Sequence, residues 1–179
     1  YGNLIRQTIK DTDHLGGIEA SLRRMAHYDY WSDKLKRSVL LDSGADVISY
    51  GMGEHSIIEL AEALDAGIPV EDITYIAGTV VKAKTLDSIY DAEILPSFED
   101  LKVDKMNYAR SFYTQYLNTD AFNGKRLVEP YSEHLYVVQN PPATPLTQME
   151  MDDVYSLSLS EDLPPVLRGE RRSSCNQRD

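Results

Sequence analysis

The sequence has very little cysteine, tryptophan and phenylalanine: one Cys, one Trp and three Phe in 179 residues. The single cysteine, Cys175, excludes a disulfide bond within the chain. Its scarcity is typical of proteins from a reducing compartment, so we expect a cytoplasmic protein.

The chain also lacks long apolar runs and an excess of basic residues. No apolar stretch approaches the roughly 20 residues that a membrane-spanning helix needs. Asp and Glu number 29 against 18 Lys and Arg, and the net charge is −11. A chain this acidic repels phosphates, which argues against direct nucleic-acid binding and against an anionic membrane surface. The polar first residues show no signal peptide, and the missing initial Met indicates a fragment.

The apolar residues, 42% of the chain, suffice for one folded domain. Their spacing predicts helices over 20–31 and 54–66, a strand over 45–50 and two strands within 73–82. The stripe of the 54–66 helix that we expect to pack on a sheet consists of Ile57, Ile58, Ala61 and Leu64. Strands and helices that alternate in this way favour the α/β class with a Rossmann-like parallel sheet and flanking helices.

The second half of the sequence is less regular. A helix is expected over 98–117 and a hairpin within 127–139, and the prolines of 140–145 predict an irregular linker. We therefore divide the chain into a Rossmann-like part (1–95), a part with helix, hairpin and linker (96–157), and a disordered tail (158–179).

Two glycine turns, Gly16-Gly17 and Gly51-Met52-Gly53, each precede an expected helix. Ligands of open α/β sheets bind at the carboxyl ends of the strands, so we expect both turns at one edge, flanking one cleft. The candidate binding residues of this cleft are Gly16, Gly17, Glu19, Gly51, Gly53 and Glu54. In the alternative interpretation, the glycines only satisfy turn geometry and Glu54 complements a helix dipole.

A second candidate group is rich in side chains that form hydrogen bonds and stack. We expect these residues to recognise a substrate or a neighbouring domain: Arg23, Arg24, His27, Tyr30 and Trp31. The alternative is a solvated helix face with a structural aromatic residue. No Ser, His and Asp show the spacing of a hydrolase triad, so we assign no catalytic residue.

Three motifs occur in a fixed order: GGIEASLRR at 16–24, HYDYW at 27–31 and YGMGE at 50–54. This order resembles the YgiQ-type radical-SAM family. The stretch VVQNPPATPLTQMEMDDVY at 137–155 resembles the segment that joins the amino-terminal domain of that family to its radical-SAM barrel. The resemblance covers most of residues 1–157 and implies an accessory domain that caps or docks on this barrel and helps to bind an unknown substrate.

The resemblance also implies that the full-length protein is a radical-SAM enzyme, with a [4Fe-4S] cluster on a CxxxCxxC triplet and with S-adenosylmethionine. Cys175 alone cannot supply three thiolates, so we expect neither cofactor, no metal site and no catalysis in this chain by itself. Residues 158–179 depart from the family pattern, which leaves open whether they are native sequence.

Two other functions remain as alternatives. One is a module that binds cobalamin or a nucleotide, because the glycine turns faintly resemble the cobalamin-binding domains that precede many radical-SAM barrels. Ligation by His14 is not expected, since Thr12 stands where the ligand motif has Asp. The other is a structural interaction domain. A large bare apolar patch would favour this alternative or the accessory domain.

Overall fold

The structure is a computed structural model that describes residues 12–157. The helix end expected within residues 1–11 and the tail 158–179 lie outside the described residues. The chain divides into two compact units between Pro145 and Leu146, and each is described by itself. In the second unit, helix α7 (Gln148–Ser156) begins with a capping box between Thr147 and Glu150.

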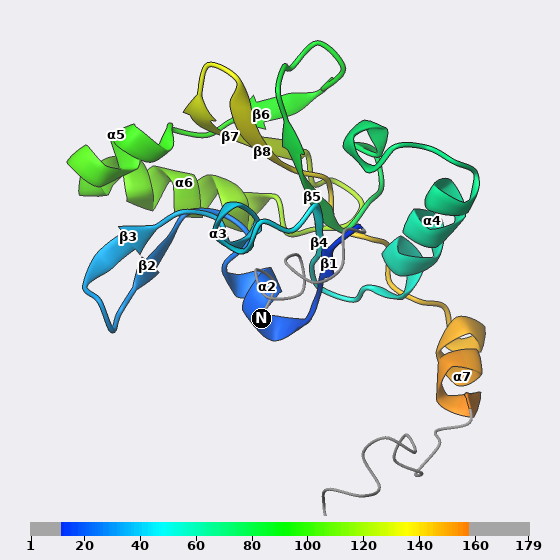
Figure 1. Ribbon diagram of the computed structural model, residues 1–179. Coiled ribbons are helices and arrows are strands. Elements are labelled where there is room, and N and C mark those ends of the chain that lie inside the picture. Colours follow the sequence, from blue (N-terminus) through cyan, green and yellow to red (C-terminus); the bar gives the residue numbers. More distant parts are fainter. Residues whose placement is uncertain (1–11, 158–179) are drawn as a thin grey trace, which may run out of the picture. The chain divides into compact units, whose positions relative to one another are not determined.

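A six-stranded sheet in the order β1-β4-β5-β8-β7-β6 forms the centre of the first unit (Figure 1). Its strands are β1 (His14–Leu15), β4 (Val47–Ser49), β5 (Thr79–Ala83), β6 (Ala92–Ile94), β7 (Arg126–Ser132) and β8 (Leu135–Gln139). The parallel pairing that we expected occurs at both edges, in β1–β4 and β6–β7. The three central pairs are antiparallel, because β5 returns beside β4 and β7 and β8 form a hairpin.

The two faces of the sheet carry separate clusters, because neighbouring residues of a strand point to opposite sides. One cluster takes from the central strands Ile48, Val80, Leu127 and Val137. The other takes their neighbours Val47, Val81, Val128 and Val138. The sheet is therefore buried on both sides, which confirms the α/β class with flanking helices.

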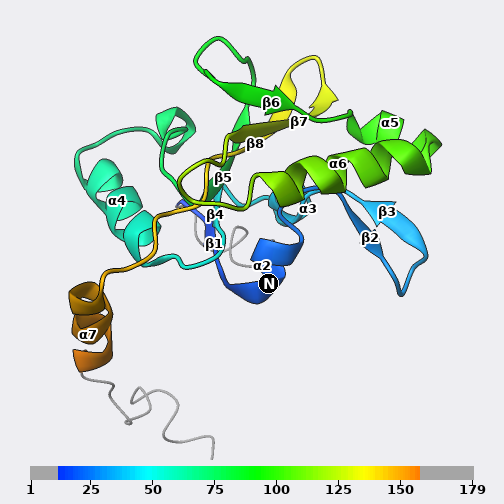
Figure 2. The same ribbon diagram turned by 180° about the vertical axis from the view of Figure 1, so that it is seen from behind.

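Helices cover both of these faces. Ala20 of α2 (Gly17–Leu22) and Leu40 of α3 (Val39–Ser43) belong to the first cluster, and Leu60 of α4 (Glu54–Asp65) belongs to the second. Helices α5 (Phe98–Val103) and α6 (Lys105–Leu117) form the expected 98–117 helix, which is broken at Asp104. The backbone of Asp104 is extended, and its side chain caps α6 by accepting from Met106 N. Figures 1 and 2 show α4 on one side of the sheet and α6 on the other.

The prediction of a helix over 20–31 is wrong, because α2 ends at Leu22. The carbonyl groups of Arg23 and Arg24 accept hydrogen bonds from Val39 N and Ser38 Oγ, at 2.9 and 2.6 Å, instead of continuing the helix. The chain then forms a hairpin of β2 (His27–Asp29) and β3 (Lys34–Lys36).

The prediction of two strands within 73–82 is also wrong. Only β5 forms there, and it is preceded by the short 3₁₀ helix η1 (Val70–Asp72) and a turn at Gly78, whose φ is +73°. Ile73 and Ile76, which we assigned to a first strand, are buried in the second cluster without strand pairing. Burial of their side chains explains the apolar pattern that suggested a strand.

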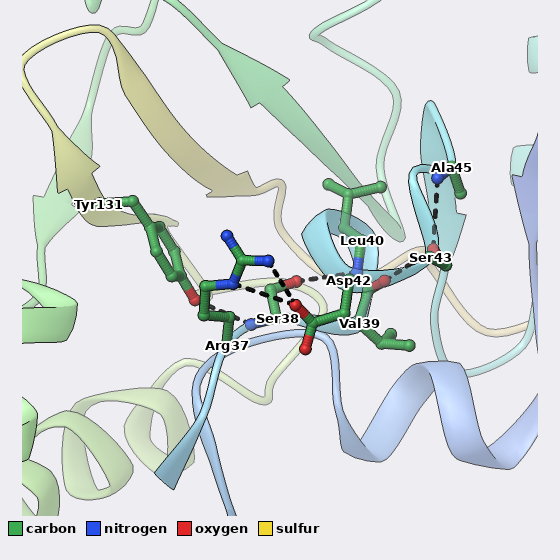
Figure 3. Close-up of polar contacts among 8 residues, drawn as sticks. All are labelled: Arg37, Ser38, Val39, Leu40, Asp42, Ser43, Ala45 and Tyr131. Atoms are coloured by element: carbon green, nitrogen blue, oxygen red, sulfur yellow. Dashed lines mark hydrogen bonds and ion pairs between the residues drawn. The ribbon is translucent and has the colours of Figure 1, made fainter. Parts of the chain in front are cut away.

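A buried carboxylate fastens the β2–β3 excursion to the sheet. Glu129 of β7 is fully buried, and its Oε1 accepts hydrogen bonds from Ala26 N at 2.9 Å and from the Tyr131 hydroxyl. The Tyr131 hydroxyl in turn accepts from Ser38 N at 2.9 Å, while Ser38 Oγ caps α3 by accepting from Leu40 N (Figure 3). Residues at both ends of the hairpin are thereby held by one strand.

Helix α4 has the expected extent, but its buried face is not the expected one. Ile57 and Ile58 are 51% and 57% exposed, whereas Ser56, Leu60 and Ala63 are buried. Ser56 turns inward because its hydroxyl lies 2.9 Å from Ser49 Oγ and 3.1 Å from the Gly53 carbonyl. A polar residue that begins the buried face is not visible to an apolar pattern, so the predicted stripe is rotated by about one residue.

These exposures give a direct test by mutation. Leu60→Ala should lower the free energy of unfolding by about 2–5 kcal/mol, because a buried side chain is removed. Ile58→Ala in the same helix is the matched control and should change it by less than about 0.5 kcal/mol. Urea unfolding followed by circular dichroism measures both values. Equal losses would contradict the orientation of α4.

A second test concerns the pH dependence of stability. Burial raises the pKa of Glu129, although its hydrogen bonds from Tyr131 and Ala26 oppose the shift. Protonated Glu129 therefore contributes to the free energy of unfolding below the ordinary pKa of Glu. This contribution is lost as the pH rises through the raised pKa.

Glu129→Gln keeps an acceptor for Ala26 N and cannot ionise. We expect the stability of the variant relative to the wild type to rise between pH 4 and pH 8, by about 1.4 kcal/mol for each unit of pKa shift removed. Urea unfolding at the two pH values measures this difference, with exposed Glu133→Gln as the control. A difference that is independent of pH would refute the account.

Candidate functional site

The two glycine turns meet at one edge of the sheet. Strands β1 and β4 are parallel, with Leu15 beside Ile48, so the turns that follow both strands lie at the same end. They line one cavity of about 330 Å³, which we call the glycine cleft. Its lining consists of His14, Gly16, Gly17, Ser49, Gly51, Gly53, Glu54 and Ile57.

Glu19, the remaining candidate, does not line this cleft. Its carboxylate forms an ion pair with Arg23 at 2.8 Å on the exposed side of α2. Exposed pairs of this kind contribute little to stability. The structure thus brings together the other five candidate residues, and their binding role stays a prediction.

The cleft contains a short chain of polar side chains. Nε2 of His14 lies 2.8 Å from Ser49 Oγ, and Ser49 is bonded to Ser56. Burial lowers the pKa of His14, which favours a neutral imidazole. The Oε2 atom of Glu54 is buried and accepts no hydrogen bond from residues 12–157. A buried acceptor without a donor costs free energy that an incoming hydrogen-bond donor would recover.

Only two of the four glycines are required by backbone geometry. Gly17 and Gly51 have φ of +88° and +70°, in the left-handed region that favours glycine. Gly16 and Gly53 have φ of −139° and −97°, which other residues adopt. A Cβ on Gly16 would meet no atom within 4 Å, and one on Gly53 would make an ordinary contact of 3.6 Å with Ser49. The space in front of Gly16 is therefore open, whereas Gly53 lies against Ser49.

The second candidate group is divided by the structure. Arg24 and His27 line another cavity of about 240 Å³, and Arg23 does not. Tyr30 and Trp31 lie at the β2–β3 turn, where Trp31 is 90% exposed and the two rings meet edge to face at 6.1 Å. These five residues therefore do not form one site.

Sequence reasoning missed the opposite wall of the second cavity. Three aromatic residues of α6 form it: Tyr108, Phe112 and Tyr116. Their spacing of four residues places them on one helix face and was the available signal. It also missed a cavity of about 610 Å³ beside η1 and the end of β5, where Lys82 lies 3.5 Å from Asp46.

The sequence matches the Radical SAM N-terminal family over residues 1–175. The chain belongs to this family. A UPF0313 protein of Clostridium botulinum is 43% identical over 171 residues, which are 95% of this chain and 26% of the relative. A UPF0313 protein of Clostridium perfringens is 46% identical over 168 residues, 93% of this chain and 25% of the relative. No solved structure matches.

Two further facts follow from this match. The chain spans about a quarter of the length of these relatives. The family match also extends into the segment 158–175, which composition and motif comparison separated from the rest of the chain. Most of the segment that we expected to be a tail thus falls within the matched region.

The family suggests a [4Fe-4S] cluster and S-adenosylmethionine in the whole protein, and the residues of this domain do not fit such a cluster. A cluster of this kind is held by several cysteine thiolates. Residues 12–157 contain no cysteine, and Cys175 is the single one in the sequence. Within 12–157, no three His, Cys, Asp or Glu side chains gather in a way that could hold a metal ion. In the same part of the chain, no helix is long and apolar enough to cross a membrane.

The first test of the cleft distinguishes a glycine that the turn geometry requires, Gly17, from one that it does not, Gly16. Gly17→Ala places a Cβ on a left-handed residue and should lower the free energy of unfolding by about 1–2 kcal/mol. Gly16→Ala, at the adjacent position, should change it by less than about 0.5 kcal/mol. Urea unfolding of the two variants makes the comparison. A large loss for Gly16→Ala would contradict the open space in front of it.

A second test concerns the cluster. Anaerobic treatment of this chain with iron and sulfide should leave no stoichiometric iron on the monomer, because one thiol cannot replace three. Iron analysis and the visible absorption spectrum measure this, with a full-length UPF0313 protein as the control. Stoichiometric iron with the absorption of a cluster would overturn the expectation.

Proposed function

We propose that this chain is an accessory domain that packs, in a full-length family protein, on the part of the polypeptide that the chain does not include. On the resemblance described above, we take that part to be a radical-SAM barrel. The supporting observation is a set of exposed apolar side chains around the glycine cleft, which we call the apolar rim: Ile18, Met52, Ile57 and Ile58.

Each residue of the apolar rim lines the cleft or is next in the sequence to a residue that does. Ile18 comes directly after Gly17, Met52 lies between the two glycines of the second turn, and Ile57 lines the cleft itself. Each side chain of the rim is more than half exposed. Apolar side chains that gather at one edge and remain in water mark a surface that another surface covers.

The size of the relatives indicates what covers this rim. About three-quarters of a UPF0313 relative lies outside the region that the chain matches, and this remainder belongs to the same polypeptide. The open space at Gly16 allows a covering segment to approach the backbone closely. In this arrangement the cleft opens toward the barrel, and Glu54 offers an acceptor to a polar group of the substrate.

Hydrogen–deuterium exchange tests the docking. The amides of 51–58 should exchange at least tenfold more slowly in the full-length protein than in this chain alone. Ile57→Glu should abolish that protection, because it puts a charge into an apolar interface. The matched control is Val103→Glu, at an 87% exposed residue of α5 outside the rim.

The outcomes separate docking from its alternatives. Equal exchange in both proteins, or full protection in Ile57→Glu, would refute docking through the rim. Protection that appears only after a nucleotide or cobalamin is added would favour the ligand-binding module instead. Protection without any effect of Gly16→Ala or Glu54→Gln on substrate turnover would favour a purely structural interaction domain.

A further inference from the structure

The second cavity differs in charge from the rest of this acidic chain. It lies between α6 and residues 22–27, and we call it the Arg24 pocket. No carboxylate lines it, although the chain has a net charge of −11. Its charged side chain is Arg24, beside His27, and the facing wall is aromatic. The pocket shares no lining residue with the glycine cleft.

The guanidinium of Arg24 is held in place by neutral groups. Its Nε donates to Oε1 of Gln139 at 2.7 Å, and its Nη1 donates to the carbonyl group of Ser21. Its Cζ lies 4.9 Å from the centre of the Tyr50 ring. Within residues 12–157, no carboxylate pairs with Arg24, and its Nη2 donates to no protein group. Because arginine remains charged at neutral pH, the pocket holds a fixed positive charge without a counter-ion.

His27 adds a second unsatisfied group. Its Nδ1 lies 3.2 Å from the Met25 carbonyl, which orients the ring. Its Nε2 is buried and has no hydrogen-bond partner among the described residues. Burial lowers the pKa of His27, and a bound carboxylate would favour the protonated ring, in which Nε2 donates to it.

The aromatic wall offers a surface for the rest of a ligand. Phe112 and Tyr116 are each 64% exposed and stand one helical turn apart on α6. Two bare rings beside a half-buried arginine favour a molecule with an apolar, flat part and an acidic end. A volume of about 240 Å³ limits that molecule to a small one.

We propose that the Arg24 pocket binds a small organic acid. Its carboxylate accepts from Nη2 of Arg24 and meets Nε2 of His27, and its apolar part lies on Phe112 and Tyr116. This binding requires neither the barrel nor the docking of the apolar rim, so it is testable in this chain alone.

Phenylacetate is a suitable probe, followed by NMR at the Arg24 Nε–H and the Ala26 amide. We expect saturable shifts at both signals. Phenylacetamide has the same ring without the charge and should bind at least tenfold more weakly. Inorganic phosphate should produce no saturable shift. Absence of saturation up to about 10 mM phenylacetate, or equal binding of the amide or of phosphate, would overturn the proposal.

Variants identify the groups that bind. Arg24→Gln removes the charge, and Phe112→Ser removes one of the three rings of the aromatic wall, so each should weaken phenylacetate binding at least tenfold. The matched control is Arg23→Gln, because the adjacent arginine pairs with Glu19 and lies outside the pocket; its affinity should stay within twofold.

One further variant keeps the test decisive if Arg24→Gln fails to fold after losing its bond to Gln139. Phe112→Asp places a carboxylate at an exposed position of the wall, where it leaves the core intact and repels an acid. It should abolish binding of phenylacetate. Unchanged affinity in this variant would overturn the proposal.

Discussion

The buried carboxylate of Glu129 is the interaction on which the arrangement of residues 23–43 depends. It accepts from Ala26 N and from Tyr131, and Tyr131 accepts from Ser38 N, so one strand fixes both ends of the β2–β3 excursion. The carbonyl groups that end α2 are engaged by the same segment. A buried polar group is costly unless it is hydrogen-bonded, and this requirement makes the geometry specific.

The parallel pairing of β1 with β4 determines the position of the glycine turns. It places two glycine turns, 35 residues apart in the sequence, around one cleft. The hydrogen bond from Ser56 to Ser49 fixes which face of α4 points inward. Ile57 and Ile58 therefore remain in solvent beside that cleft. A polar contact of the interior thus creates the apolar rim on the surface.

The chain belongs to the Radical SAM N-terminal family, yet its single cysteine cannot supply the three thiolates that a [4Fe-4S] cluster of radical-SAM proteins needs. On our proposals it has two binding surfaces: the apolar rim meets the remainder of the polypeptide, and the Arg24 pocket meets an organic acid. They share no lining residue, so each can be removed by mutation without the other.

The sequence alone determined the family, the α/β class, the extent of α4, the irregular 140–145 segment and the shared edge of the glycine turns. These depend on motifs or on residues a few positions apart, which local propensity and periodicity capture. Only the tertiary structure decided the end of α2 at Leu22, the orientation of α4, the antiparallel centre of the sheet and the aromatic wall opposite Arg24. Each of these depends on partners that are distant in the sequence or polar, as with Ala26 and Glu129, which are 103 residues apart. Such partners meet only when the sheet has formed, because no local pattern records which strand a segment will contact.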